Sequence, residues 1–232
     1  GHTTNGDTIL TFHTDAHASG INPEERVRIT SDGKIGIGNV SSPDSNVEIR
    51  TDSNGEGVLI KSTGDTSNAL TFDANRGADG VIGVVYGRWN GTTVAQMSFI
   101  SGSDGTNKDD GVITFGTESA ASSGNVNATE RMRIDSSGQV GIGVTPDTWS
   151  TGAGITVGTS QGTLWGAGDQ INLSGNAYFN SGWKAAASKT GASQIEQALG
   201  NIDFKVSGSV TADSAITFTN AMRIKSDGKV GI

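Results

Sequence analysis

Residues 26–38 read RVRITSDGKIGIG, residues 131–143 read RMRIDSSGQVGIG, and residues 222–232 read MRIKSDGKVGI. Each copy places alternating apolar residues on both sides of a Ser-x-Gly turn, where glycine adopts a positive φ at no steric cost. In the first copy the period of two puts Val27, Ile29, Ile35 and Ile37 on one face of a hairpin. Gly36, on the opposite face, indicates close approach of another backbone. The repeat therefore predicts a fold built on one recurring hairpin.

A short strand that ends in Thr-Phe precedes each copy of the motif. These strands are Ile9-Leu10-Thr11-Phe12, Ile113-Thr114-Phe115 and Ile216-Thr217-Phe218. The distance from the Phe to the central motif Arg is 16, 18 and 5 residues. A connection that shortens to a few residues joins antiparallel neighbours. We therefore expect a three-stranded antiparallel meander with a variable first loop.

The composition favours strands, and it suggests a shared core. The chain has 35 Gly, 19 Ile, 16 Val and 26 Thr but only 6 Leu, and β-branched residues suit a pleated surface. The four apolar side chains of one hairpin contribute roughly 8 kcal/mol if buried. Ordering about 12 residues costs on the order of 15 kcal/mol. A lone meander is therefore unstable, whereas copies meeting on an axis would cover each other's apolar faces and sheet edges.

We therefore predict an all-β chain that forms an elongated homotrimeric fibre. Its parts would be short antiparallel meanders and small β-sandwich or prism modules, with at most one short helix. The motif copies divide the chain into residues 1–38, 39–143 and 144–232, of which the last ends within its motif.

Two inserts separate the motif copies. In the first, short strands are expected at residues 57–60 and 81–86, between turns rich in Gly, Asp and Asn. In the second, residues 193–200 carry a Ser-x-x-Glu capping box, a short apolar run and a terminal Gly. This pattern predicts the single short helix, and an irregular loop is the alternative for so short a run.

Charge and composition exclude several classes of partner. The formal net charge is −8, which argues against nucleic acid because phosphate binding needs a basic surface. The sequence has no apolar stretch near the roughly 20 residues that span a bilayer, so we expect no membrane insertion. The chain has no cysteine, which excludes disulfides and thiolate metal sites.

At these residues the chain resembles bacteriophage tail-fibre and tail-spike proteins. Residues 25–38 and 130–143 share E-R-[VM]-R-I-x-S-x-G-x-[IV]-G-I-G, which resembles the repeat upstream of the intramolecular-chaperone autoprotease domain in many such proteins. Residues 176–184 are similar to stretches found in the same proteins. The resemblance implies a homotrimeric fibre on a virion, outside the cell, that binds other tail proteins and a host-surface glycan or protein.

The same resemblance implies that a chaperone domain follows Ile232 in a precursor. The catalytic serine and lysine of that domain have no counterpart in these residues, so we predict no enzyme activity, no catalytic residue and no cofactor. Two alternatives remain open. One is a non-viral adhesin or extracellular filament, and the other is a glycan-degrading spike, which needs two carboxylates across a groove. The adjacent acids Asp109-Asp110 and Glu24-Glu25 are expected to be solvated.

Aromatic residues are the candidates for receptor binding. Trp89, Tyr86, Trp183 and Tyr178 could stack on sugar rings, although Trp and Tyr are also enriched at subunit interfaces. Trp89 is the best candidate because it lies beside a turn. The stretch His13-Thr14-Asp15-Ala16-His17 would put His13, Asp15 and His17 on one face of a strand, where imidazole and carboxylate could hold a metal. We expect a solvated loop there instead.

Overall fold

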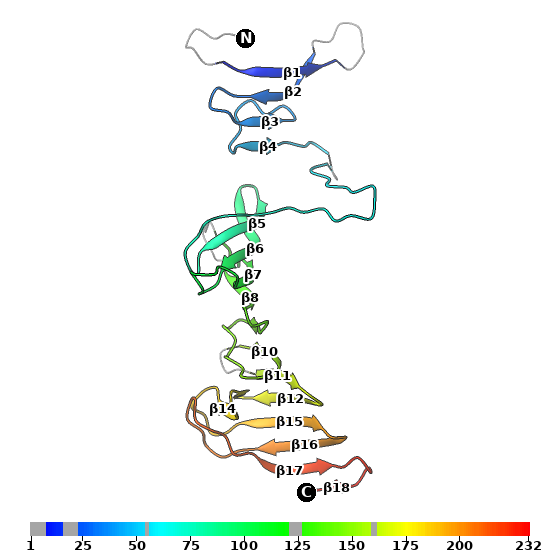
Figure 1. Cartoon of the computed structure of the whole chain (residues 1–232), viewed down its shortest axis with the longest axis vertical. Helices are drawn as coiled ribbons and strands as arrows, with labels where there is room; N and C mark the ends of the chain where they lie inside the picture. The colour runs from blue at the N-terminus through cyan, green and yellow to red at the C-terminus, as the bar shows by residue number, and fades with distance from the viewer. Residues whose placement is uncertain (1–7, 16–22, 54–55, 121–126, 159–161) are drawn as a thin grey trace. The chain divides into compact units, whose positions relative to one another are not determined.

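The computed structural model describes residues 8–15, 23–53, 56–120, 127–158 and 162–232. All regular elements in these residues are β-strands, so the chain is all-β (Figure 1). The chain divides into two compact units, Gly1–Leu70 and Thr71–Ile232. The first motif copy lies in unit 1 and the other two lie in unit 2. The three-part division drawn from the motif stays a prediction.

Unit 1 contains a four-stranded sheet in the order β1-β2-β3-β4. Its strands are β1 (Leu10–Thr14), β2 (Glu24–Ile29), β3 (Ile35–Ile37) and β4 (Val47–Ile49). The first three form the predicted antiparallel meander. β4 then pairs parallel with β3, with Val47 opposite Ile35 and Ile49 opposite Ile37. A parallel neighbour requires the chain to cross over the sheet, and the motif sequence did not reveal this crossover.

Unit 2 contains a twelve-stranded sheet in the order β18-β17-β16-β15-β12-β11-β10-β9-β8-β7-β6-β5, and a separate hairpin of β13 and β14. The first six strands are β5 (Val81–Trp89), β6 (Thr92–Ser101), β7 (Gly111–Thr117), β8 (Glu130–Ile134), β9 (Val140–Ile142) and β10 (Ala153–Val157). The next four are β11 (Gly162–Ala167), β12 (Gln170–Gly175), β13 (Ala177–Phe179) and β14 (Trp183–Ala185). The last four are β15 (Ser193–Ala198), β16 (Asn201–Val206), β17 (Thr219–Ile224) and β18 (Val230–Gly231).

The three motif hairpins have the same turn. In the first copy the Thr30 N–H donates to the Lys34 carbonyl (2.9 Å), and the Gly33 N–H donates to the Thr30 carbonyl (2.9 Å). Equivalent bonds close the turns at residues 135–139 and 225–229. The turn glycines have φ of 83°, 78° and 80°, as expected from the sequence. The preceding Asp32 is not among the residues with positive φ, so this is the three-residue loop with a glycine bulge, not a type I′ turn.

The first strand of the third meander was predicted wrongly. In copies one and two, Thr11 and Thr114 lie opposite the motif residues Arg28 and Arg133. In copy three Asp203 of β16 lies opposite Arg223, so the equivalent strand is Ile202-Asp203-Phe204. Residues 216–218 are not in a strand. The Ile216 N–H donates to the Trp183 carbonyl (2.9 Å), and the Phe218 ring packs edge-on against Trp183. The predicted 5-residue connection between the first strand and the motif is therefore wrong. The antiparallel order of the three strands is correct.

The motif glycine lies under the crossover loop. A Cβ on Gly36 would be 2.8 Å from the Val40 carbonyl oxygen, and one on Gly141 would be 2.1 Å from the Val144 carbonyl oxygen. The predicted close approach of another backbone is therefore confirmed in these two copies. Around Gly231, the equivalent residue of the third copy, no described atom lies within 4 Å of such a Cβ.

The predicted helix at residues 193–200 is wrong. Residues 193–198 form β15, between β12 and β16 in the sheet. Leu199 and Gly200, with φ of 52° and 75°, form a two-residue turn between β15 and β16. The terminal Gly is thus a hairpin residue and not a helix cap. Sheet neighbours on both sides satisfy the backbone of this short run, which a single helical turn cannot do.

The first insert is also simpler than expected. The strand predicted at residues 81–86 forms part of β5, but the described residues of 57–60 are not in a strand. β5 and β6 extend the same sheet as β7 and β8. Among the described residues of this insert no second sheet packs on them, so these residues do not show the predicted sandwich, and the alternative of a prism layer stays a prediction.

Aliphatic side chains lie on the open face of the sheet in unit 2. Across ten neighbouring strands, one residue per strand forms a row that we call the central apolar ladder: Phe99, Ile113, Ile134, Val140, Ile155, Leu164, Leu173, Ile195, Phe204 and Met222. Leu164 is 41% exposed and Leu173 57%. Within the described residues no Ile, Leu, Phe or Met is buried. The described residues therefore cover this row only in part, and least at Leu164 and Leu173.

The opposite face is covered, and it carries polar residues. Thr156, Thr163, Asn172 and Gln194 alternate with the ladder and are at most 3% exposed. A core of Trp149, Trp165 and Tyr178 packs on this face, with Phe179 and Trp183 around it. The Thr163 hydroxyl donates to the Ala177 carbonyl (2.8 Å) and so ties the sheet to the β13–β14 hairpin.

The motif glycines provide a matched stability test. Gly141→Ala should lower the free energy of unfolding by about 1–3 kcal/mol, because its Cβ meets the backbone of the crossover loop. Gly231→Ala should change it by less than about 0.5 kcal/mol, because the space there is open. Urea denaturation at equal protomer concentration measures both. Equal losses for the two variants would contradict the role given to the crossover loop.

Candidate functional site

The predicted aromatic candidates separate into two groups. Tyr178 and Trp183 belong to the covered core of unit 2. The Tyr178 side chain is 8% exposed, and its hydroxyl donates to the Asp213 carboxylate (2.7 Å). The Trp183 ring meets Trp165 edge-on at 5.5 Å. Both rings thus pack within the chain, and Tyr178 has no open face on which a sugar could stack.

Tyr86 and Trp89 lie on β5, near the tip of the β5–β6 hairpin. The Arg88 guanidinium carbon lies 4.9 Å from the centre of the Tyr86 ring, so these two side chains share a face. The Tyr86 hydroxyl donates to the Asn127 side-chain oxygen (3.2 Å). Trp89 is 79% exposed and falls on the other face by the strand period of two. The structure therefore separates the two exposed candidates.

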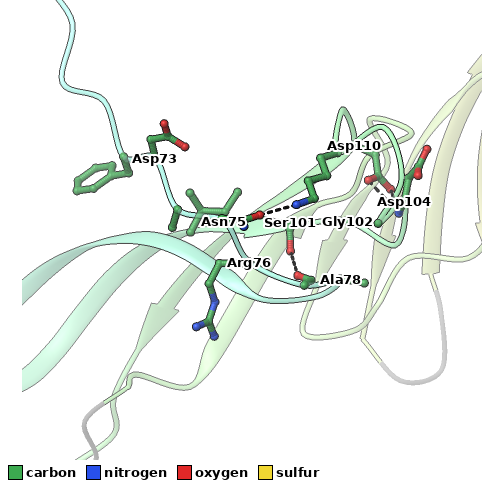
Figure 2. A pocket seen from close by; sticks show the side chains of 14 residues that line it. Asp73, Asn75, Arg76, Ala78, Ser101, Gly102, Asp104 and Asp110 are labelled. Carbon is green, nitrogen blue, oxygen red and sulfur yellow. Dashed lines mark hydrogen bonds between the residues drawn. The ribbon is translucent and has the colours of Figure 1, made fainter.

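A pocket of about 310 Å³ lies between residues 72–78 and the loop after β6 (Figure 2). The Ser101 hydroxyl donates to the Gly77 carbonyl (2.7 Å) and accepts from the Gly80 N–H (2.9 Å). On the other side, Lys108 Nζ donates to the Asn75 side-chain oxygen (Figure 2). These bonds join residues that are 21 to 33 positions apart in the sequence.

Two carboxylates shape the loop wall of this pocket. Asp110 accepts from the backbone N–H groups of Ser103 (3.0 Å) and Asp104 (3.1 Å). Asp104 accepts from Asn107 (3.1 Å) and Thr106 (2.8 Å). These backbone hydrogen bonds lower the pKa of Asp104 below its ordinary value. Both carboxylates therefore act as acceptors that fix the loop.

The remaining side chains of the pocket offer contacts to a ligand. Phe72 stacks on Phe99, with ring centres 5.8 Å apart, and is 38% exposed. Figure 2 shows the side chains of Asp73 and Arg76 extending from the same segment in different directions. Within the described part of the chain neither forms an ion pair. An aromatic ring beside planar hydrogen-bonding groups suits a polyhydroxylated ligand.

The adjacent acids considered as catalytic candidates have structural contacts. Glu25 accepts two hydrogen bonds from Arg28, at 2.6 and 2.8 Å, and hydrogen bonding to Arg28 is the main cause of its lowered pKa. Glu24 pairs with Arg26 at 2.8 Å. In the pair Asp109-Asp110, Asp110 binds the backbone of the loop after β6.

The structure describes two of the three residues in the metal hypothesis, His13 and Asp15. The ring of His13 on β1 donates from Nδ1 to the Pro23 carbonyl (3.3 Å). Asp15 follows β1, and His17 lies outside the described residues. Among the residues that the structure places, no group of three His, Cys, Asp or Glu side chains could hold a metal ion. In the same residues there is no helix that could cross a membrane.

Neither a scan against models of known protein families nor a search of curated proteins finds a match for this chain. The candidate sites are therefore identified from the geometry of this chain alone. Sequence reasoning missed the pocket at residues 72–78 because its walls come from irregular segments. The one signal in the sequence was the run Asp104-Gly-Thr-Asn, in which side-chain acceptors favour a self-capped loop.

The buried tyrosine gives a prediction on pH dependence. Burial, with the nearby Asp213 carboxylate, raises the pKa of Tyr178 to about 12, whereas an unfolded tyrosine titrates near 10. The folded state therefore binds the proton more tightly, and this contribution to stability is present below pH about 10 and is lost as the pH rises toward 12. Tyr178→Phe should remove this alkaline loss, while costing about 1 kcal/mol at neutral pH for the hydrogen bond.

Ultraviolet absorbance of tyrosinate checks this titration directly. Tyr86 is the only other tyrosine, so a Tyr86→Phe background leaves Tyr178 as the sole signal. Unfolding curves of the two proteins between neutral pH and pH 12 then give the stability difference. A titration midpoint of the Tyr178 hydroxyl near pH 10 in the folded protein would contradict this prediction, because it would show that water reaches the hydroxyl in the core.

Proposed function

We propose that this chain is a structural segment of a bacteriophage tail fibre. In this proposal it assembles as a homotrimer and takes part in recognition of the host surface. The observation that carries the assembly is the central apolar ladder on the open face of the unit 2 sheet. The hairpin motif and its resemblance to fibre repeats support the tail-fibre assignment.

A second copy of the chain is the partner that fits this face. The ladder puts apolar side chains at the same register on ten neighbouring strands, so another copy presents a matching row. Burying a half-exposed Leu such as Leu164 or Leu173 is worth about 1 kcal/mol, and the less exposed Ile side chains of the ladder add smaller amounts. Contacts repeated along the ladder can then offset the free energy lost on association. Three copies with ladders facing an axis form a closed arrangement.

This assembly would assign different roles to the two faces of β5. Trp89 shares the face of the ladder and becomes an assembly residue. Tyr86 and Arg88, on the other face, remain open to solvent. They form one candidate receptor-contact surface, and the pocket beside Asp73 and Arg76, at the other end of the β5–β6 hairpin, is a second. Phe72 stacks on Phe99 and so belongs with the ladder. A cation on an aromatic ring and a pocket with planar polar groups both suit a sugar.

Light scattering of the purified chain tests the assembly. We expect a mass of three chains, where one chain is 23.7 kDa. Leu173→Asp should weaken association by at least about 100-fold, because a carboxylate would have to be desolvated in the interface. Leu199→Asp is the matched control. Leu199 is 77% exposed at the β15–β16 turn, so the same charge should not affect assembly there.

A folded circular-dichroism spectrum must accompany each mass. A folded monomer of the unmodified chain would refute the proposed assembly. If Leu173→Asp stays trimeric, the ladder is not the interface.

Binding to bacterial envelope material tests the recognition role. The labelled chain is incubated with purified lipopolysaccharide and with capsular polysaccharide from a panel of bacteria. We expect binding to some of these that falls at least about tenfold when Arg88 and Arg76 are both changed to Ala. Released oligosaccharide would instead indicate a glycan-degrading spike. No binding across the panel, with assembly intact, would leave a shaft segment without a receptor role and so refute the recognition part.

A further inference from the structure

The exposed arm of unit 1, residues 56–61, carries apolar side chains with no cover. Its sequence is Glu-Gly-Val-Leu-Ile-Lys, and Val58, Leu59 and Ile60 are 73%, 83% and 50% exposed. The arm was predicted to contain a strand, yet it pairs with no described strand. Its backbone has one recorded hydrogen bond within the described residues, from the Asn68 side chain to the Ile60 carbonyl (3.2 Å). A strand-forming sequence is thus left without a partner strand.

The same unit contains an unpaired strand edge. β4 is the last strand of the four-stranded sheet, and among the described residues it pairs only with β3. Val47 and Ile49 end two apolar rows that begin at Leu10 and Phe12 on β1. Both are poorly covered, at 54% and 40% exposure. An uncovered edge of this kind accepts an added strand.

We propose that the exposed arm of one copy adds to the β4 edge of a second copy, as an antiparallel strand. With Val58 opposite Ile49 and Ile60 opposite Val47, the arm lengthens both apolar rows by one residue. Leu59 falls on the other face, where Val40 and Pro43 pack over Gly36. Each copy gives an arm and receives one, so the β4 edge of every copy is paired.

The charges that flank the two segments favour this direction. The arm begins at Glu56 and ends at Lys61, while β4 is preceded by Asp44 and followed by Arg50. An antiparallel approach brings Glu56 toward Arg50 and Lys61 toward Asp44. A parallel approach would bring Lys61 toward Arg50, and like charges opposite one another destabilise a strand pair.

The inference rests on the proposed self-assembly and adds to it an exchange of strands between copies. A copy is the fitting donor because its arm carries the spacing that both rows require. In its own chain the arm lies unpaired. Exchange of an identical element is a known low-cost route to closed oligomers.

Engineered cysteines test the exchange cleanly, because the chain has none of its own. Val58→Cys and Ile49→Cys are made as separate variants with different tags and are refolded together. Opposed residues in an antiparallel pair lie about 5.5 Å apart between Cα atoms, which suits a disulfide. Any disulfide between the two tags joins two copies by construction. The control replaces Ile49→Cys with Leu199→Cys, which is also highly exposed.

We expect on the order of tenfold more mixed disulfide from the 58–49 pair than from the 58–199 control, because paired strands hold the thiols at a high effective concentration. Equal yields, with a trimeric mass by light scattering, would overturn the exchange but leave the self-assembly intact. A monomeric mass would refute both the strand exchange and the self-assembly. If a single chain with both cysteines forms only an internal disulfide, the arm pairs with its own β4 and the exchange is wrong.

Discussion

The alternation of side chains along a strand constrains this molecule more than any single contact. In unit 2 the sheet can present its aliphatic residues to one side only, and the chain covers the other. Thr156, Thr163 and Asn172 are almost completely buried, while Leu164 and Leu173 on the same strands are about half exposed. This is the reverse of the usual arrangement in a soluble protein. This incompletely covered row is the feature on which the proposed assembly rests.

The motif arginine shows how the repeat tolerates change. Arg28 and Arg133 each bind a glutamate three residues earlier, Glu25 and Glu130, through two hydrogen bonds. Arg223 has Asn220 at that position and binds Asp203 on the neighbouring strand instead. In each copy the guanidinium keeps a carboxylate partner, although the partner comes from a different place. The geometry of the meander is thus maintained while the sequence around the motif varies.

The local features of the fold could be predicted from the sequence, and the long-range ones could not. The hairpin turns and the meander follow from glycine at positive φ and from apolar alternation. The parallel strand β4 has only three residues, Val47–Ile49, too few to indicate a partner or a direction. Ile216-Thr217-Phe218 has the letters of a first strand, but Phe218 is part of the aromatic core. The capping-box letters at residues 193–196 also fit a strand, and sheet neighbours on both sides decide the outcome.

The same limit applies to the candidate site. The exposure of Trp89 beside a turn was predictable, because the Asn90-Gly91 pair marks a hairpin tip. The burial of Tyr178 was not, because it depends on Asp213 and on the β13–β14 hairpin. The pocket near Phe72 was out of reach for the same reason, since its walls meet only in the folded chain.

The buried polar row explains why the sheet does not turn its aliphatic face inward. A slip of one residue would exchange the two faces of a strand. That slip would remove the bond from the Thr163 hydroxyl to the Ala177 carbonyl and place Leu164 there in its stead. Asn172 adds no hydrogen bond that would favour this register, because both polar atoms of its side chain are buried with no partner in the described residues. Leaving such groups unpaired costs about 1–3 kcal/mol, but the slip would also turn the Trp165 ring, which is 2% exposed in the aromatic core, to the open face. Packing of this ring against Trp149, Phe179 and Trp183 therefore favours the present register within the chain itself.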